Sequence, residues 1–227
     1  MGNNYNRELK KATEIHSMEW ENALIFGKQN DGTGSNGQKE RETDGILNFV
    51  KTNVPANFAD FQNSEDSDYQ AQTWLQAGKT FLNNHIKVLH RYLQGESMWL
   101  CGDGALQGIN DLAETYGSIR LETKEVSYGI KVTEWHTANG SIFLKTHPLL
   151  SQEPSTQYLM IGLDPSNVQL CPLQGNGEDG DIDLEEDIQP KGRDAKTDQF
   201  IGEMGTKFYH PDQFMILDGI GKDHTDA

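Results

Sequence analysis

Apolar side chains recur at helical spacing over the first part of the chain. The segment from Asn6 to Phe26 contains neither Gly nor Pro, and its apolar positions form two slightly offset stripes. The stripes comprise Leu9, Ala12 and Ile15, followed by Trp20, Ala23 and Leu24. Such spacing is typical of an amphipathic helix, and glycine is a common residue just after a helix end. The pattern therefore predicts one long helix that ends before Gly27.

A second helical pattern runs from Tyr69 to Leu93. Its apolar positions are spaced by three, four and seven residues, and they are Trp74, Leu75, Phe81, Leu82, Ile86, Leu89 and Leu93. Asp68 is suited to cap the N-terminus of this helix, and Gly95 is suited to end it.

After Ser97 the pattern changes to short apolar runs and alternation. A strand from Met98 to Cys101 leads through glycines into a helix from Ala105 to about Tyr116. Alternating segments then predict strands at Ile119–Thr123, Gly129–His136, Ser141–Thr146 and Tyr158–Leu163. Asn139-Gly140 is a strong two-residue hairpin signal between the middle pair. We therefore expect an α+β fold with antiparallel strands.

Polar segments separate these elements. Asn30 to Asp44 has too few apolar residues to order itself, which predicts a surface loop, and the apolar segment Gly45–Val54 must dock on the body. Gln174 to Asp198 is acidic and predicts an exposed arm. The chain then returns through apolar segments that predict a closing pair of strands, namely Phe200-Ile201, Lys207–His210 and Phe214–Leu217.

Composition narrows the classes of function. Hydrophobic residues make up 35% of the 227 residues, below the roughly 45–50% of an ordinary globular chain, which indicates surfaces that find partners elsewhere. The 19 basic and 35 acidic residues give a formal net charge of −16. Nucleic-acid binding needs clustered Lys and Arg, so this balance argues against a protein that grips phosphates. Acidity alone mostly indicates solubility.

The remaining features predict a soluble, reduced protein. No secretion signal is visible at the N-terminus, and no apolar run approaches the ~18 residues of a membrane span. Cys101 and Cys171 lie in apolar, strand-like stretches and are expected to be buried thiols. All four tryptophans have apolar neighbours and are expected in the core more often than at an interface; they are Trp20, Trp74, Trp99 and Trp135.

One glycine-rich turn has the right context for a nucleotide site. Gly102, Gly104 and Gly108 follow a predicted strand and open a predicted helix, as in a dinucleotide fingerprint. However, the third glycine stands one position late, because Gln107 occupies its usual place. The candidate acids downstream, Glu122 and Glu125, lie in an acidic surround that repels pyrophosphate. A plain tight turn is therefore the favoured interpretation.

Metal and catalytic sites have weaker candidates. His85 and His90 are five residues apart, so they do not share one helix face as zinc ligands do. Asp179, Asp181 and Asp183 alternate as in a calcium loop, but Leu184 stands where that loop needs glycine. Neither cysteine has basic neighbours that activate a thiol. We therefore predict no catalytic, cofactor-binding or metal-binding residues, no cofactor and no enzyme activity.

The order of these segments resembles the major capsid proteins of tailed phages of the SU10-like group, which share the HK97 capsid fold. The resemblance covers nearly the whole chain but contains no single diagnostic motif. The residues that carry it are Glu14–Lys28, the loop to Arg41, Gly45–Val54, Met98–Tyr116, Tyr128–Trp135, Leu163–Pro165 and Thr197–Glu203.

This resemblance implies a domain arrangement. Residues 1–97 would hold the long spine helix and part of the peripheral domain, 98–170 the axial domain, and 171–227 an acidic loop with strands returning to the peripheral domain. Members of the family usually carry an N-terminal arm and an extended β-hairpin before the spine helix, whereas here the chain begins almost at that helix. Cleavage, trimming or a smaller set of lattice contacts would each account for the difference.

The resemblance also implies a function and partners. The chain would self-assemble into hexamers and pentamers of an icosahedral shell around phage double-stranded DNA, after synthesis in the bacterial host cytoplasm. Its neighbours would be its own copies, a portal, decoration or scaffolding proteins, and DNA as a weak, non-specific neighbour, with no membrane. Two alternatives stay open: the shell of an encapsulin-like nanocompartment, and a small nucleotide-binding enzyme that uses Gly102, Gly104 and Gly108.

Overall fold

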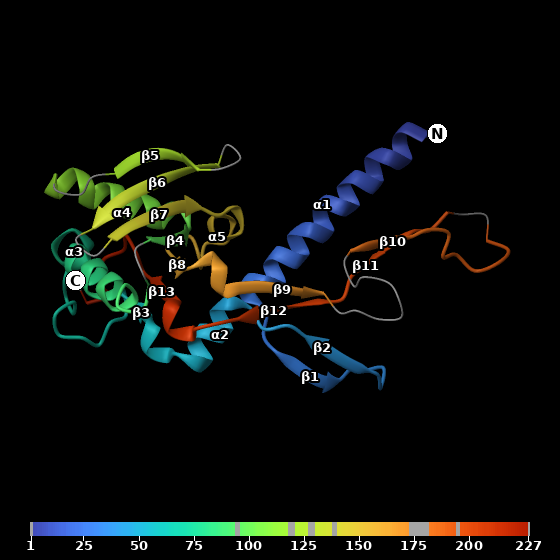
Figure 1. Ribbon diagram of the computed structural model, residues 1–227, viewed down its shortest axis with the longest axis horizontal. Coiled ribbons are helices and arrows are strands. Elements are labelled where there is room, and N and C mark those ends of the chain that lie inside the picture. The colour runs from blue at the N-terminus through green and yellow to red at the C-terminus, as the bar shows by residue number, and fades with distance from the viewer. Residues whose placement is uncertain are drawn as a thin grey trace. The chain divides into compact units, whose positions relative to one another are not determined.

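The computed structural model describes residues 2–93, 96–117, 121–126, 130–137, 140–172, 182–193 and 196–226. The chain divides into two compact units, drawn together in Figure 1. Unit 1 comprises residues 1–49 and 168–208, and unit 2 comprises residues 50–167 and 209–227. These boundaries differ from the predicted domain limits at residues 97 and 170, although one boundary falls close to 170. The predicted capsid domains thus stay a prediction.

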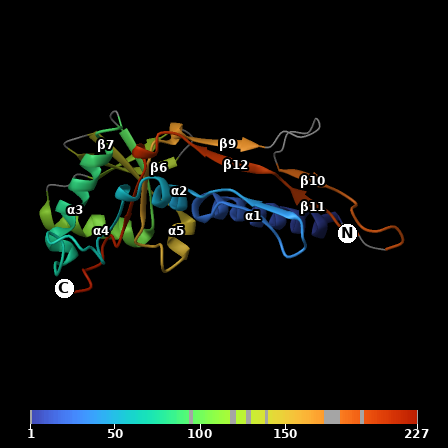
Figure 2. The same ribbon diagram turned by 90° about the horizontal axis from the view of Figure 1, so that it is seen from below.

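Unit 1 combines one long helix with short ladders. Helix α1 (Gly2–Phe26) is followed by the antiparallel strands β1 (Asn30–Thr33) and β2 (Lys39–Glu42). Strands β9 (Val168–Pro172) and β12 (Met204–Phe208) form a second antiparallel ladder. Strands β10 (Asp183–Glu185) and β11 (Gln199–Ile201) form a third. Figure 2 shows the β10–β11 ladder lying beyond the end of the β9–β12 ladder. Helix α2 (Ile46–Asn53) crosses the boundary into unit 2.

Unit 2 is built on a seven-stranded mixed sheet in the order β3-β13-β8-β4-β7-β6-β5. The bounds of these strands are β3 Phe58–Asp60, β13 Met215–Asp218, β8 Met160–Leu163, β4 Glu96–Cys101, β7 Gly140–Thr146, β6 Ile130–Thr137 and β5 Leu121–Val126. The accompanying helices are α3 Trp74–Leu89, α4 Asp103–Tyr116 and α5 Pro148–Gln152. Short 3-10 turns lie at Pro55–Asn57, Pro165–Asn167 and Pro211–Gln213.

The hydrophobic core lies in unit 2. Aromatic rings at its centre pack edge to face, with ring centroids 5.0 Å apart for Phe61 and Trp74 and 5.3 Å apart for Phe61 and Phe81. Helices α3 and α4 contribute one apolar stripe each, and the sheet contributes Trp99, Ile142 and Leu144. Three of the four tryptophans, Trp74, Trp99 and Trp135, are buried there as predicted.

The helices are close to the prediction, with one corrected start. Helices α1 and α4 confirm the predicted segments. Helix α3 begins at Trp74 rather than Tyr69, because Gln76 accepts a hydrogen bond from the Thr73 amide at 3.1 Å and closes a capping box there. Asp68 therefore does not cap α3, which ends at Leu89, well before the predicted end. Gly95 lies outside the described residues.

The strands of the sheet are also close to the prediction, but their pairing is not all antiparallel. Strands β5 to β8 occupy the four predicted segments, although residues 119, 129 and 139 lie outside the described residues. Strand β4 runs parallel to β7, and β13 runs parallel to β3. Alternation along one strand reports its exposed face and not the direction of its neighbour, so the sequence pattern missed these pairs.

Two predictions about polar and returning segments were wrong. The segment Asn30–Asp44 is exposed, as a surface loop would be, but it forms a hairpin of β1 and β2, in which Arg41 lies 3.5 Å from Asp31. The returning segments do not pair with one another, because β12 joins β9 while β13 joins β3 and β8. The apolar segment after Gly45 forms helix α2, whose Val50 is fully buried.

No helix among the described residues has both the length and the apolar composition that a membrane crossing requires.

Candidate functional site

The glycine-rich turn before α4 is filled by the protein itself. A Cβ atom at Gly102 would lie 2.2 Å from the Gln157 carbonyl oxygen, and one at Gly104 would lie 2.7 Å from the Tyr158 ring. The first amides of α4 are also engaged, since Asp103 N–H donates to Ser151 Oγ at 3.2 Å and Ala105 N–H donates to Gln157 O at 2.9 Å. These are the amides that a phosphate needs, so the glycines serve close packing.

Gly108 has the same structural role. Its Cβ position lies 2.5 Å from the Cα of Gly221, so the C-terminal segment crosses α4 at this point. The Gly108 carbonyl oxygen accepts a hydrogen bond from the Trp74 indole at 2.8 Å. The three glycines of the candidate fingerprint thus join α4 to two other segments of unit 2.

The other candidates from the sequence do not converge. His85 bonds to the Phe81 carbonyl oxygen at 2.9 Å, and burial lowers its pKa. His90 bonds to Ser97 Oγ at 3.1 Å, so the two histidines face different partners. Of the alternating aspartates, Asp179 and Asp181 lie outside the described residues. Among the described residues, no group of three or more His, Cys, Asp and Glu side chains is placed to hold a metal ion.

The two cysteines differ in exposure. Cys101 is fully buried on β4, and desolvation raises the pKa of its thiol to about 12. Cys171 is exposed on β9, which corrects the expectation that both thiols are buried. The apolar neighbours of Cys171 in the sequence do not cover it, because β9 belongs to a two-stranded ladder with exposed side chains.

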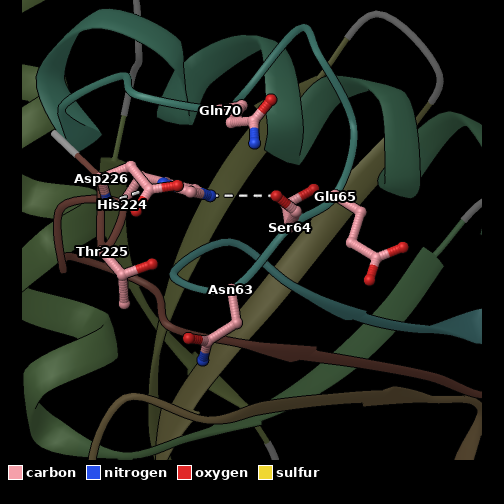
Figure 3. Close-up of a pocket in the computed structure, with 7 residues that line it drawn as sticks. All are labelled: Asn63, Ser64, Glu65, Gln70, His224, Thr225 and Asp226. Atoms are coloured by element: carbon pink, nitrogen blue, oxygen red, sulfur yellow. Dashed lines mark hydrogen bonds between the residues drawn. The ribbon is translucent and has the colours of Figure 1, made fainter.

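A small polar pocket lies where the C-terminal segment meets the loop before α3. His224 is 5% exposed, and its Nε2 lies 2.9 Å from the Ser64 carbonyl oxygen while its Nδ1 accepts from the Asp226 amide at 3.1 Å. Figure 3 shows His224 and Ser64 facing one another, with Glu65 turned away. Both ring nitrogens of His224 are used, so this pocket fastens the C-terminus to the body.

Unit 1 differs from unit 2 in how little apolar surface it buries. Among its described side chains, only Ile25 and Ile46 are buried hydrophobic residues, and the main core cluster lies wholly in unit 2. Most of the exposed large hydrophobic side chains are also in unit 1. They are Tyr5, Ile15, Met18, Leu170, Ile182, Ile188 and Ile201. The described residues of unit 1 therefore expose more large hydrophobic side chains than they bury.

One face of α1 is covered within unit 1. His16 stacks on Phe200 of β11 with ring centroids 5.7 Å apart, and Trp20 Nε1 donates to His16 Nε2 at 2.9 Å. Trp20 is half-buried, so the prediction of a core position does not hold for it.

A polar clasp fastens the start of α1 to the segment after β10. The Tyr5 hydroxyl donates to Asp198, and Lys196 Nζ lies 3.5 Å from Asp198 and 4.6 Å above the Tyr5 ring. The Asp187 amide adds a bond of 2.9 Å to Asp198. The Tyr5 bond, followed by the Asp187 amide, lowers the pKa of Asp198, and the same Tyr5 bond raises the pKa of Tyr5. Lys196 also bonds Glu186 at 3.2 Å.

The opposite face of α1 is open. Ile15 is 53% exposed and Met18 is 46% exposed. At 100° per residue, their direction lies roughly 150° around the helix axis from that of His16 and Trp20. Helix α1 therefore packs on β11 with one face and presents apolar side chains to solvent on the other.

A groove of about 990 Å³ opens beside β2. Two runs of consecutive residues line it, 39–43 and 202–205, and the other lining residues are Trp20, Cys171 and Pro172. Cys171 and Pro172 are the ladder partners of Gly205 and Met204. Because neighbouring residues of a strand point to opposite faces, consecutive lining residues indicate that strand edges form the walls. Thr206 holds the walls together at one end, where its amide donates to Thr43 Oγ1 at 3.1 Å.

The hydrogen-bond register shows which backbone groups of β2 face away from β1. Gly34 N–H donates to Gln38 O at 2.8 Å, so residues 34 and 38 form a hydrogen-bonded pair. In an antiparallel ladder such pairs alternate, which makes Gly32 with Glu40 the next one. The N–H and C=O groups of Lys39 and Arg41 therefore point outward. Sequence reasoning missed this edge, although the alternation Lys-Glu-Arg-Glu at 39–42 is the signal of a polar strand.

Comparison with known families gives a match over almost the whole chain. The family model described as SU10 major capsid protein matches residues 1–221. The major capsid protein of Pseudomonas phage PaMx41 is 24% identical over 234 aligned positions, which cover 96% of this chain and 53% of that protein. The chain thus spans about half the length of the curated relative it matches.

Comparison with solved structures supports the fold. The cryo-EM structure of the holo-SrpI encapsulin complex from Synechococcus elongatus PCC 7942 matches with a TM-score of 0.59 at 16% identity. The match covers 97% of this chain and 66% of the encapsulin chain. Encapsulins have the HK97 fold, so the predicted α+β, HK97-like fold is confirmed.

Proposed function

Because this chain belongs to the SU10 major capsid protein family, we propose that it is the repeating subunit of an icosahedral phage shell. In this role copies of the chain form hexamers and pentamers that enclose double-stranded DNA. The chain acts by assembly, without a reacting centre or a cofactor.

The observation that supports this proposal is the composition of unit 1. Its described residues bury two hydrophobic side chains, Ile25 and Ile46, yet expose seven large ones. A unit with so little buried apolar area gains stability when further apolar surface is covered. Copies of the same chain are the partners that a shell supplies on every side, so the exposed side chains of unit 1 are its proposed contacts.

Repetition explains how modest contacts hold such a shell. Each copy meets several neighbours, and each contact is repeated by symmetry. Once one contact has formed, the others become nearly intramolecular, so the combined strength far exceeds that of any single contact. The mature location is then the virion capsid, after synthesis in the host cytoplasm.

The net negative charge of the chain is consistent with the proposed DNA content of the shell. A net charge of −16 favours weak, non-specific contact with packaged DNA, because phosphates are repelled rather than gripped. A portal and scaffolding or decoration proteins complete the proposed set of partners.

Electron microscopy of the purified full-length chain tests the proposal. Closed particles or capsomers at high protein concentration are the expected result. Monodisperse monomers under all assembly conditions, including added scaffold and portal proteins, contradict it. The contents of particles recovered from infected cells separate a virion shell, which holds DNA, from a nanocompartment shell, which holds protein cargo.

A further inference from the structure

We propose that strand β9 pairs with β9 of a second copy of this chain, antiparallel and around a two-fold axis at Leu170. This inference rests on the proposed function, since it assigns residues to one of the contacts between copies of the shell. It commits to one occupant of the outer edge of β9, which is the same edge of another copy.

The free edge of β9 is the one turned away from β12. Within the described residues, β9 and β12 form a sheet of two strands. The far edge of β12 is engaged, because the Thr206 amide donates to Thr43 Oγ1 at 3.1 Å and the Thr206 hydroxyl donates to the Asp44 carbonyl oxygen at 2.8 Å. In Figure 2, β9 runs above β12. A free strand edge is a template for a further strand.

Two hydrogen bonds fix which backbone groups of β9 point outward. The Tyr209 amide donates to the Asn167 carbonyl oxygen at 2.9 Å, one step beyond the end of the ladder, so these two residues form a hydrogen-bonded pair. The amide of Thr206, the ladder partner of Leu170, is instead turned away from β9. Hydrogen-bonded and non-hydrogen-bonded pairs alternate in an antiparallel ladder. The N–H and C=O groups of Val168 and Leu170 therefore point away from β12.

These outward groups match those of a second copy. A rotation of 180° about Leu170 places the two Leu170 residues opposite one another, where each N–H meets the C=O of the other copy. Val168 then lies opposite Pro172, so the Val168 N–H meets the Pro172 C=O. Proline has no N–H to donate, and at this position it serves as an acceptor only.

This register uses the whole strand. All five residues of β9 lie opposite residues of the second β9 when the pair is centred on Leu170. A pair centred on Gln169 would keep only residues 168–170, because the chain before Val168 forms the 3-10 turn Pro165–Asn167.

The side chains of β9 suit a symmetric pair. The strand reads Val-Gln-Leu-Cys-Pro and contains no charged residue, and Leu170 is 47% exposed in the free subunit. Pairing brings the two Leu170 side chains together on one face of the sheet, where covering their apolar surface is favourable. On the other face, Gln169 lies opposite Cys171 of the second copy.

Other strands of unit 1 disfavour the same arrangement. The residues of β2 alternate Lys-Glu-Arg-Glu, so a symmetric pair centred on Glu40 or Arg41 sets like charges opposite one another, which is destabilising. A symmetric pair of β10 strands would set Asp183 opposite Glu185. The uncharged edge of β9 avoids this repulsion, although the whole chain has a net charge of −16.

The pair joins two ladders into one sheet of the order β12-β9-β9-β12. A sheet of two strands alone is marginally stable, and added strands strengthen it. The contact is isologous, so it closes after two copies. Within a shell it would therefore join copies in pairs, and other surfaces would form the hexamers and pentamers.

Cross-linking in the full-length chain tests the register. Gln169 and Cys171 of the second copy form a non-hydrogen-bonded pair, whose Cα atoms lie about 4.5 Å apart. This separation is within the roughly 4.4–6.8 Å of disulfides. We expect Gln169→Cys to give a cross-linked dimer under a mild thiol oxidant, with mass spectrometry locating the bond between position 169 and Cys171 of the other copy. Lys207→Cys is the matched control and should give no dimer, because Lys207 shares this face but lies one strand farther away.

Charges at the centre of the pair give a reversible readout. Leu170→Asp and Leu170→Lys each set like charges opposite one another, and each should weaken dimer formation at least roughly tenfold in analytical ultracentrifugation. An equal mixture of the two variants restores opposite charges on different copies, so it should dimerise nearly as well as the unchanged chain. Leu75→Asp is the matched control, since Leu75 is 45% exposed in unit 2, and it should leave dimerisation unchanged.

The outcomes separate this pairing from the proposed function. Particles in which position 169 does not cross-link to Cys171, or a mixture no better than either variant alone, overturn the pairing and leave the shell proposal intact. A bond between position 169 of both copies shows a shifted register and also overturns it. A cross-linked dimer from a chain that never forms particles supports the pairing and contradicts the proposed function instead.

Discussion

The backbone amide of Gly45 donates a hydrogen bond to the carbonyl oxygen of Gly27 at 3.0 Å. This bond joins the end of α1 to the start of α2 and closes the β1–β2 hairpin segment at its base. The two backbones approach so closely that a Cβ atom at Gly45 would lie 2.5 Å from the Gly27 nitrogen. Glycine is needed at position 45 for this close approach and not for an unusual backbone angle, since neither Gly27 nor Gly45 has a positive φ angle.

Replacement of Gly45 by Ala should therefore destabilise the chain. The added methyl group meets backbone atoms that cannot move independently, so we expect a loss of about 1–3 kcal/mol in the free energy of unfolding. Urea denaturation followed by circular dichroism measures it. Gly205→Ala is the matched control in the same unit, because its Cβ would have an ordinary contact of 3.5 Å with Thr43 Oγ1. Equal effects of the two substitutions would contradict this explanation.

A second prediction concerns the start of α3. Asp223 Oδ1 accepts a hydrogen bond from the Trp74 amide at 2.8 Å, so a side chain from the C-terminal segment satisfies one of the free amides of the first turn. Asp223→Ala should cost about 1 kcal/mol, as loss of a helix cap typically does. Thermal unfolding compares it with Asp226→Ala, which removes an equal charge from an exposed neighbour. The prediction fails if both variants melt at the same temperature.

A third prediction concerns the titration of the clasp. The hydroxyl of Tyr5 stabilises the ionised form of Asp198, so the pKa of Asp198 is lowered in the folded chain. The stability that this carboxylate contributes is present above the unfolded pKa near 3.8 and is lost as the pH falls through the folded pKa. Tyr5→Phe keeps the ring beneath Lys196 but removes the hydroxyl, and should raise the titration midpoint of Asp198 in carbon-detected NMR. An unchanged midpoint would show that the hydroxyl bond is not formed in solution.

The two thiols give a fourth prediction. In the folded chain, a maleimide reagent at neutral pH should label Cys171 rapidly and Cys101 only on unfolding. Cys101 is fully buried and its pKa is about 12, so it holds almost no thiolate. Mass spectrometry counts the labels, and Cys171→Ser should leave the native chain unlabelled. Rapid labelling of that variant would contradict the burial of Cys101.

Local pattern predicted the elements of this chain better than their connections. The apolar positions of α1 and α4 predicted these helices correctly, because a helix depends on contacts between residues three and four positions apart, which the local sequence contains. The direction of β4 relative to β7 depends on residues more than 40 positions apart in the sequence, for which the pattern of one strand holds no information. The exposure of Cys171 depends in the same way on β9 having a single partner.

The sequence of the β1–β2 hairpin contains a turn signal, but the low apolar content of the segment outweighed it in the prediction. Asn36-Gly37 stands at its turn, where Gly37 has a φ of 78° and Gly37 N–H donates to Gly34 O at 2.9 Å. A three-residue hairpin loop commonly places glycine at such a left-handed position. Its low apolar content instead favoured the prediction of a surface loop. Strand β2 was missed for the same reason, since its side chains are all exposed and backbone pairing with β1 stabilises it.

The last prediction separates folding from assembly within one helix. Ile15 and Ile25 both belong to α1, but Ile15 is 53% exposed and Ile25 is 7% exposed. Ile15→Ser should change the free energy of unfolding of the isolated chain by no more than about 0.5 kcal/mol, since it removes a side chain that covers little within the subunit. Ile25→Ser should cost about 2–5 kcal/mol, because it removes buried apolar surface and introduces a hydroxyl. If the open face of α1 is covered by a neighbouring copy, Ile15→Ser should nevertheless raise the protein concentration needed for particles in sedimentation assays. Particles that form at the wild-type concentration would show that this face of α1 stays exposed in the shell. The contacts between copies would then involve other surfaces of unit 1.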